Sequence, residues 1–268
     1  MTNTIKQRLL KGETVTATWL DMGSAEAADI LVNAGWDVVV IDCEHGAAGL
    51  EEGLGLIRAV QAAGGEAVLR VPDGSDTTLK RALDRGARSI IVPMVNTPDQ
   101  ARSIVQSCRY PGRGGRGYAA PIVRASGYGR WATYAQEAHD DLLLMVQCEH
   151  IETLPHLREI GAIEGVDMVF VGPNDLAASM GLLEQLEHPD LARAKGEIER
   201  VCGEAGIGLG TILGGGRSWA ALQEAGYRFI IGPNDIAMLF AAARTARNEM
   251  LQELAPKTAT PAAAARSY

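Results

Sequence analysis

The sequence predicts an α/β fold, a single (β/α)8 TIM barrel that occupies residues 1–254. Eight short apolar runs alternate with segments in which apolar residues recur every three or four positions, the spacing of amphipathic helices. The runs are apolar almost throughout, which indicates parallel strands covered on both faces. No GxGxxG motif follows the first run, so a closed barrel is favoured over an open doubly wound sheet.

The expected elements follow one another in a regular order. The eight strands are TVTATWL from Thr14, DVVVID from Asp37, EAVLR from Glu66, SIIVPMV from Ser89, LLLMVQCE from Leu142, DMVFVG from Asp167, IGLGTIL from Ile207 and RFIIG from Arg228. Several of the helical segments between them begin at a Ser or Asp suited to capping and end near a glycine, as in SAEAADILVNAG from Ser24 and SWAALQEAG from Ser218. All strands of such a barrel open at one mouth, where the catalytic side chains lie.

Two segments depart from this alternation. Residues 109–139 are rich in Gly, Arg, Tyr and Pro and lie between the fourth and fifth strands. We expect this long segment to lie over the barrel mouth and to shape the substrate entrance. The tail, residues 255–268, is low in complexity, so we expect it to be disordered and assign it no function.

Composition narrows the classes of function. With 47% hydrophobic residues and 31 glycines the chain can bury one large core, although 268 residues would also fit two small domains. No apolar stretch approaches the roughly 20 residues of a membrane span, and the first residues lack the apolar core of a signal peptide. The four scattered cysteines indicate reduced thiols in a cytoplasmic protein. A formal charge of −8 disfavours nucleic acid and anionic membranes, so we expect a small-molecule ligand.

Two carboxylates, Glu149 and Asp175, each follow an apolar strand. A buried ionised acid is costly unless a cation or a hydrogen-bond donor meets it, so this pair is a candidate metal site. Two carboxylates suit Mg²⁺ or Mn²⁺, whereas zinc more often recruits His or Cys. Cys148 and His150 flank Glu149, but in a strand they point to the opposite face.

Other interpretations of these acids remain open. In one of them, Glu149 and Asp175 only pair with arginines such as Arg70. Glu152 is a rival carboxylate, although it falls in the following helix, where we expect it to be solvated.

Further polar residues end the neighbouring strands and should converge on the same mouth: Trp19, Asp42, Glu44, His45, Arg70 and Gln147. His45 alone would be an ordinary structural histidine, but beside a metal site and an arginine it becomes a candidate general base. Arg70 is either a counterion to the acid cluster or a group that faces an oxyanion, and both roles are compatible.

Taken in order, these motifs resemble the HpcH/HpaI aldolases, a family of metal-dependent (class II) pyruvate aldolases. The resemblance covers most of the chain and rests on TWL, IDCEH, VLRVP, LDRGARSIIVPMV, the YPGRGGRG region, VQCEH and EGVDMVFVGPNDLAASMG. VQCEH stands where a VQIET-like form is more typical. The separation of the two acids, 175 − 149 = 26, aligns Glu149 rather than Glu152 with the family ligand.

The resemblance implies a role for each matched residue. Glu149 and Asp175 would bind a divalent metal ion, Mg²⁺ or Mn²⁺ with Co²⁺ as a further option, while His45 accepts a proton and Arg70 stabilises the transition state. Substrate contacts would come from Gln147, Gly172, Pro173, Asn174, Asp175 and Trp19. Asp84 resembles a residue that acts on the histidine of a neighbouring subunit, so we expect a homo-oligomer, a hexamer by family resemblance.

The implied activity is an aldolase that forms an enolate from pyruvate or a substituted pyruvate such as hydroxypyruvate. The enolate adds reversibly to an aldehyde, and the reverse reaction cleaves 4-hydroxy-2-oxo acids. A Schiff-base mechanism needs a lysine at the mouth, and none of the five lysines ends a strand.

Two alternatives stay open. The first is an acyl-CoA lyase of the citrate lyase β or malyl-CoA type, for which Arg113, Arg116, Arg124 and Arg130 would supply basic surface. The second is a non-catalytic 2-oxo acid binding protein.

Overall fold

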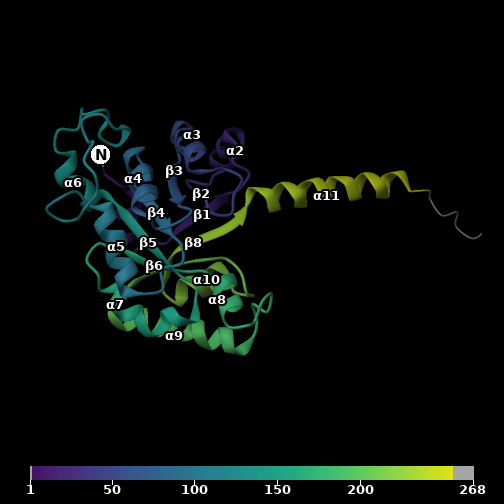
Figure 1. The fold of residues 1–268 in the computed structure, drawn as a ribbon. Helices are drawn as coiled ribbons and strands as arrows, with labels where there is room; N and C mark the ends of the chain where they lie inside the picture. Colours follow the sequence, from purple (N-terminus) through teal and green to yellow (C-terminus); the bar gives the residue numbers. More distant parts are fainter. Residues whose placement is uncertain (1, 256–268) are drawn as a thin grey trace, which may run out of the picture. The chain divides into compact units, whose positions relative to one another are not determined.

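The structure, a computed structural model, describes residues 2–255. It confirms the α/β barrel: eight parallel strands close into a ring in sequence order (Figure 1). The strands are β1 Val15–Leu20, β2 Val38–Asp42, β3 Glu66–Arg70, β4 Ser89–Val92, β5 Leu143–Cys148, β6 Met168–Val171, β7 Gly208–Ile212 and β8 Tyr227–Asn234. Each overlaps one of the eight apolar runs.

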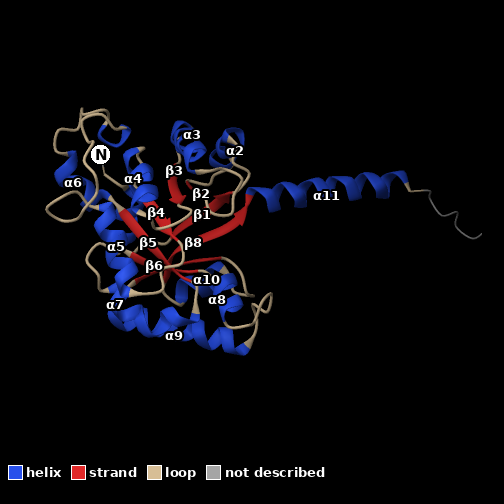
Figure 2. Cartoon of the chain, in the orientation of Figure 1, coloured by secondary structure: helices blue, strands red, loops and turns tan. Residues whose placement is uncertain are grey.

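Helix α1 precedes the first strand, and the helices from α2 to α10 lie around the barrel (Figure 2). Ser24, Ser75 and Ser218 cap α2, α4 and α10 by accepting a backbone N–H from the first turn, which fixes where these helices begin. The α-helices are α1 Thr4–Leu10, α2 Ala25–Asn33, α3 Leu50–Ala62, α4 Asp76–Asp84, α5 Pro98–Cys108, α6 Tyr134–Asp141, α7 Leu157–Gly161, α8 Pro173–Ser179, α9 Pro189–Ala205, α10 Trp219–Glu224 and α11 Asp235–Leu254, with 3₁₀ turns η1 Arg124–Ser126 and η2 Ile151–His156.

The barrel interior is a packed apolar core, to which α1 contributes Ile5. Alternate residues of each strand point inward, as in Val38 and Val40 of β2 and Leu143 and Met145 of β5. The same alternation, continued to the carboxyl ends of the strands, turns polar residues inward at the mouth. The inward-facing alternation of the strands therefore places the polar residues of the candidate site at the mouth of the barrel.

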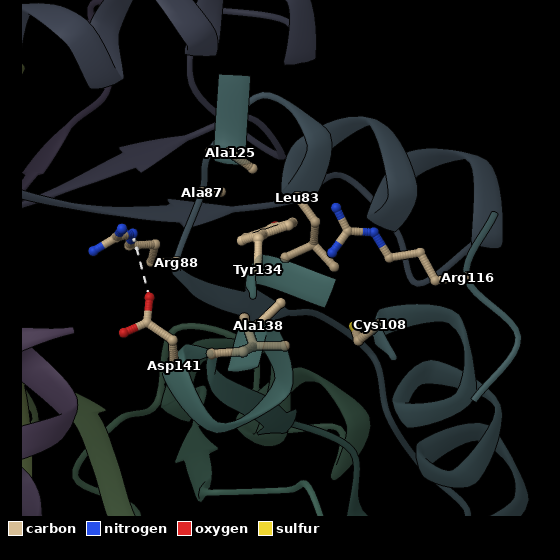
Figure 3. Close-up of a pocket in the computed structure, with 11 residues that line it drawn as sticks. Leu83, Ala87, Arg88, Cys108, Arg116, Ala125, Tyr134, Ala138 and Asp141 are labelled. Atoms are coloured by element: carbon tan, nitrogen blue, oxygen red, sulfur yellow. Dashed lines mark ion pairs between the residues drawn. The ribbon is translucent and has the colours of Figure 1, made fainter. Parts of the chain in front are cut away.

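The segment 109–139 does not lie over the mouth, contrary to the expectation from its composition. It follows α5 and returns the chain to β5, so it lies at the end of the barrel where the strands begin. There Arg124 Nη1 donates to the carbonyl of Arg85, 3.0 Å away. Figure 3 shows Tyr134 and Arg116 beside a cavity of about 20 Å³, room for about one water molecule. A segment between a helix and the next strand belongs to this end, whatever its composition.

The chain divides into two compact units at Asp235. The first holds the complete barrel, and the second begins at Ile236 and contains nearly all of α11. The expectation of disorder concerns a tail that, from residue 256 on, lies outside the described residues. Within residues 2–255 no helix combines the length and apolarity that crossing a membrane requires. The four cysteines are free and buried.

Candidate active site

Glu149 is the first residue after β5 and is only 2% exposed. It continues the inward-facing series of Leu143 and Met145, which explains its burial. Its Oε1 accepts the backbone N–H of Met94 at 2.6 Å, and its Oε2 accepts the side-chain amide of Gln147. Met94 has a φ of 54°, a left-handed conformation that is unusual for a side chain of its size. The carboxylate is thus held in place by donors from two strand ends.

Asp175 approaches from the neighbouring strand end. It lies in the first turn of α8, after Pro173 at the first helical position and Asn174 at the second, and its side chain is exposed. An acid in a first turn is favoured by the helix dipole. Only a glycine fits at position 172, directly before this turn, because a Cβ there would lie 2.6 Å from Glu149 Oε2.

The electrostatic environment of Glu149 suits a bound cation. Burial raises the pKa of Glu149 to about 7; the Met94 N–H works in the opposite direction, and the charges of Glu44 and Asp175 add to the rise. The side-chain Oε1 of Gln147 is buried and has no hydrogen-bond partner among the described residues. A divalent cation would relieve the repulsion between the acids.

Neither acid forms an ion pair with a basic side chain of the described residues. Within residues 2–255 no lysine or arginine nitrogen lies within 4.0 Å of the carboxylates of Glu149 or Asp175. Neither acid therefore forms the arginine ion pair that the alternative interpretation expects. No group of three or more His, Cys, Asp or Glu side chains in that part of the chain is arranged to hold a metal. Water and substrate would have to supply the remaining positions around a cation.

Across the mouth, Arg70 forms a bidentate pair with Asp42. Arg70 Nε and Nη2 donate to the two carboxylate oxygens at 2.9 and 2.6 Å, and Nη1 lies 3.2 Å from Glu44 Oε2. The guanidinium carbon lies 4.5 Å from the centroid of the Trp19 ring. Burial raises the pKa of Asp42, but hydrogen bonds and charge from Arg70 outweigh it and hold that pKa below its ordinary value. Arg70 is therefore a fixed cation.

His45 lies on the turn that follows β2. Asp42 Oδ1 accepts the backbone N–H groups of Glu44 and His45 at 3.0 and 3.2 Å, so one carboxylate positions both the arginine and the turn. The imidazole is 67% exposed, and its Nε2 lies 3.9 Å from Glu44 Oε1. The exposed ring, with Glu44 as its only charged neighbour within 4.0 Å among the described residues, is accessible to a substrate.

Asp84 is not brought to the mouth of its own barrel. It ends α4, whose carboxyl end lies where the strands begin, and its Oδ1 accepts from Arg116 Nη2 at 2.6 Å. Arg116 has a side chain only 2% exposed, and its guanidinium carbon lies 4.5 Å from the Tyr110 ring centroid. Asp84 and His45 of one chain therefore occupy opposite ends of the barrel.

The flanking residues lie as expected. Glu152 is in η2 with a side chain 80% exposed, which confirms that it is solvated. His150 caps that turn by accepting the Glu152 N–H on Nδ1, 3.3 Å away. Cys148 is the buried last residue of β5, one position out of register with Gln147 and Glu149.

Sequence reasoning missed two contributors to the site. It identifies Asp42 as a strand-end acid without a role, although its spacing from Val38 and Val40 already predicts an inward side chain beside Arg70. The Met94 N–H has no sequence signal, because it depends on a left-handed backbone conformation after β4.

Known proteins resemble this chain over most of its length. A family model described as HpcH/HpaI aldolase/citrate lyase matches residues 16–242. A hydroxypyruvate/pyruvate aldolase of Roseobacter denitrificans is 39% identical over 238 residues, 88% of this chain and 93% of that one. A 2-dehydro-3,6-dideoxy-6-sulfogluconate aldolase of Pseudomonas putida is 36% identical over 251 residues, 94% of this chain and 96% of that one. The crystal structure of an HpcH/HpaI aldolase/citrate lyase family protein from Burkholderia cenocepacia superposes with a TM-score of 0.86 and 38% identity, covering 93% and 99% of the two chains.

Proposed function

This chain belongs to the HpcH/HpaI aldolase/citrate lyase family, and its relatives support an aldolase; we propose that it is a divalent-metal-dependent aldolase. Its donor would be pyruvate or a substituted pyruvate such as hydroxypyruvate, and its acceptor an aldehyde. In reverse it would cleave 4-hydroxy-2-oxo acids.

One observation carries the proposal above all. Glu149 is a buried acid whose pKa is raised to about 7 by burial and by neighbouring carboxylates, and a fixed arginine and an exposed histidine share its mouth. If these residues only balanced one another's charges, Glu149 would form an ion pair with Arg70. Here Arg70 is already occupied by Asp42 and Glu44, which leaves Glu149 and Asp175 for a cation.

The chemistry follows from the residues present. Glu149 and Asp175 would hold a metal ion of the Mg²⁺, Mn²⁺ or Co²⁺ type, which when bound polarises the ketone of a 2-oxo acid and acidifies the adjacent C–H. His45 would take that proton. Arg70, held by Asp42 and shielded by Trp19, would stabilise the negative charge of the enolate oxygen. The enolate carbon then attacks the aldehyde carbon, the new carbon–carbon bond forms, and the aldehyde oxygen takes up a proton.

The donor's other groups would meet the remaining strand ends. The buried side chain of Gln147 and the Gly172–Asn174 turn border the same acid pair. The N–H of Asn174 is among the first-turn amides of α8 that the helix itself does not use, and it suits a carboxylate of the substrate.

We also propose that the active enzyme is a homo-oligomer, a hexamer by family resemblance, in which Asp84 acts on the His45 of a neighbouring subunit. The placement of Asp84 supports this, because within one chain it lies at the opposite end of the barrel.

The acyl-CoA lyase alternative loses its sequence support. Arg113, Arg116, Arg124 and Arg130 all belong to the segment at the far end of the barrel rather than to the mouth. Arg116 is moreover buried against Asp84.

The deciding experiment combines chelation with a substrate screen. Protein treated with EDTA should show no consumption of pyruvate or hydroxypyruvate with any aldehyde, and Mn²⁺, Mg²⁺ or Co²⁺ should restore it. Full activity after exhaustive chelation would overturn the metal-dependent mechanism. Binding of oxalate or pyruvate without turnover or proton exchange would favour a non-catalytic binding protein.

A further inference from the structure

Asp21 continues the inward face of β1 beyond the end of that strand. Val15, Ala17 and Trp19 belong to the barrel core, and Asp21 follows Trp19 by two residues. The two-residue period of a strand therefore turns the Asp21 side chain towards the mouth. The proposed catalytic steps do not use this acid.

The backbone of Asp21 is held from two directions. Its N–H donates to Asp235 Oδ1 at 2.9 Å, and its carbonyl accepts the N–H of Ala47 at 2.8 Å. Asp235 is itself only 5% exposed, and Ala47 follows His45 by two residues on the turn after β2. Asp21 is therefore fixed beside the turn that carries the proposed base.

The side chain of Asp21 has hydrogen-bonding capacity that the protein does not use. Among residues 2–255 its Oδ1 has no hydrogen-bond partner, and no lysine, arginine or histidine nitrogen lies within 4.0 Å of its carboxylate. Burial raises the pKa of Asp21 to about 6, and the charges of Asp42 and Asp235 add to the rise. Arg70 and a hydrogen bond from the Asn234 side chain oppose it. Asp21 is thus an acid near the Arg70–Asp42 pair that is not itself ion-paired.

Asp21 and the proposed metal ligands lie on opposite sides of the mouth. The strands close in sequence order, so β1 stands four places from β5 in the ring of eight. Glu149 follows β5 and Asp175 follows β6, whereas Arg70 ends β3, between the two sides. A 2-oxo acid that is held at Glu149, Asp175 and Arg70 would leave the side of β1 to the aldehyde.

Carboxylates outnumber cations around Arg70. Its guanidinium interacts with the charges of Asp42, Glu44 and Glu149. It also interacts with the charge of Asp21. A divalent cation and the carboxylate of a 2-oxo acid would together add only one positive charge, so this part of the mouth would stay negative. A second anionic group would be repelled here, whereas a hydroxyl group could donate a hydrogen bond to a carboxylate.

We propose that Asp21 selects the aldehyde acceptor, favouring an uncharged aldehyde that carries hydroxyl groups over one that carries a carboxylate or a phosphate. This role depends on the proposed aldolase activity and adds the chemical class of its acceptor. The ionised carboxyl of Asp21 would accept a hydrogen bond from an acceptor hydroxyl, and its charge would oppose an anionic acceptor. Asp235 and the turn after β2 hold the acid in place for this contact.

The test compares three aldehydes, each with pyruvate and Mn²⁺ at pH 8, where Asp21 is ionised. Glyceraldehyde carries hydroxyl groups, propanal has none, and succinic semialdehyde carries a carboxylate. In the parent, kcat/KM for glyceraldehyde should exceed that for each of the others by about tenfold or more, the size of one hydrogen bond to a charged group.

Two variants separate charge from hydrogen bonding. Asp21→Asn should reduce the preference over succinic semialdehyde by about tenfold, and Asp21→Ala should reduce the preference over propanal by a similar factor. Asp29→Asn, the same change at an exposed position of α2, is the matched control and should keep both preferences.

Proton exchange of pyruvate in D₂O, followed without an aldehyde, reports on the donor separately. Asp21→Asn should lower aldol turnover with glyceraldehyde more than it lowers this exchange. An equal loss of both would make Asp21 a support of the fold and overturn its role in selection. A parent that prefers succinic semialdehyde would also overturn that role, and would point to arginines of a neighbouring subunit as the groups that meet the acceptor.

The two proposals fail in different ways. Absence of pyruvate exchange in the parent with Mn²⁺ would overturn the aldolase proposal and the role of Asp21 together. Exchange in the parent, with acceptor preferences that Asp21→Asn leaves unchanged, would overturn only the role of Asp21.

Discussion

Gly172 lies so close to Glu149 that any side chain would collide with it. A Cβ on Gly172 would be 2.6 Å from Glu149 Oε2 and 2.9 Å from Glu149 Cβ. The φ of Gly172 is −93°, an ordinary value, so the requirement for glycine is one of space and not of backbone conformation. The first residue after β6 thereby sets the position of the buried acid after β5.

Gly172→Ala should therefore damage the site more than the fold. Displacing Glu149 should weaken Mn²⁺ binding and aldol turnover by about 10-fold to 100-fold, with a loss of about 1–3 kcal/mol in unfolding free energy from overpacking. Titration calorimetry and urea denaturation measure the two effects. Gly196→Ala is the control, since a Cβ there meets nothing within 4 Å. Unchanged Mn²⁺ affinity in Gly172→Ala would contradict the role given to Glu149.

Glu149→Gln should change how stability depends on pH. The folded-state pKa of Glu149, about 7, lies above its ordinary value of 4.5, so the metal-free native state keeps a proton that the unfolded chain has released. Stability is then lost as pH rises from 4.5 through 7, by about 3 kcal/mol at pH 8.

Denaturation in EDTA at pH 5 and pH 8 measures this loss. Glu149→Gln should reduce this pH dependence, and the remainder should come from Asp21, whose pKa burial raises to about 6. Glu152→Gln, the exposed neighbouring acid, should retain the full pH dependence. Mg²⁺ or Mn²⁺ should restore stability at pH 8 in the parent only. An equal pH dependence in parent and Glu149→Gln would show that another group titrates.

Asp42→Asn should weaken the contacts by which one carboxylate positions both Arg70 and the turn that carries His45. Arg70 loses its bidentate carboxylate partner, and the remaining ion pair to Glu44 does not fix its orientation. We expect a fall in kcat of at least about tenfold and a loss of about 1–3 kcal/mol in unfolding free energy. Asp37→Asn, at an exposed pair with Arg8, is the control and should lose less than about 1 kcal/mol. A variant with parental kcat would remove Asp42 from the positioning role.

His45→Ala should abolish proton exchange without affecting the fold. The ring is 67% exposed, so its removal opens no cavity. In D₂O with Mg²⁺, the parent should exchange the methyl protons of pyruvate, as followed by NMR, and His45→Ala should lose both this exchange and aldol turnover. His150→Ala, on the outward face after β5, should exchange at the parental rate. Parental exchange in His45→Ala would assign the base to another residue.

The proposed role of Asp84 can be tested by mixing two inactive variants. If each site takes His45 from one subunit and Asp84 from another, co-assembled His45→Ala and Asp84→Asn chains regain intact sites at roughly a quarter of positions. Activity of the mixture against that of each variant alone measures this recovery. No recovery in oligomers shown by mass to contain both chains would confine the role of Asp84 to its pairing with Arg116.

The sequence by itself determined the barrel and the inward face of its strands. Eight apolar runs and serine caps leave few other ways to bury the chain, and the two-residue period of a strand carries Val38 and Val40 on to Asp42, and Leu143 and Met145 on to Glu149. Periodicity and capping are local properties of the chain, so the order of residues is sufficient to identify these inward-facing acids.

Only the tertiary structure decided which of these residues meet. It paired Arg70 with Asp42 rather than with Glu149, supplied the Met94 N–H through a left-handed backbone, and put segment 109–139 at the far end of the barrel. Such pairings depend on distances between strand ends far apart in sequence and on single backbone angles. Composition and periodicity do not encode those quantities, because many packings share the same pattern of apolar and polar positions.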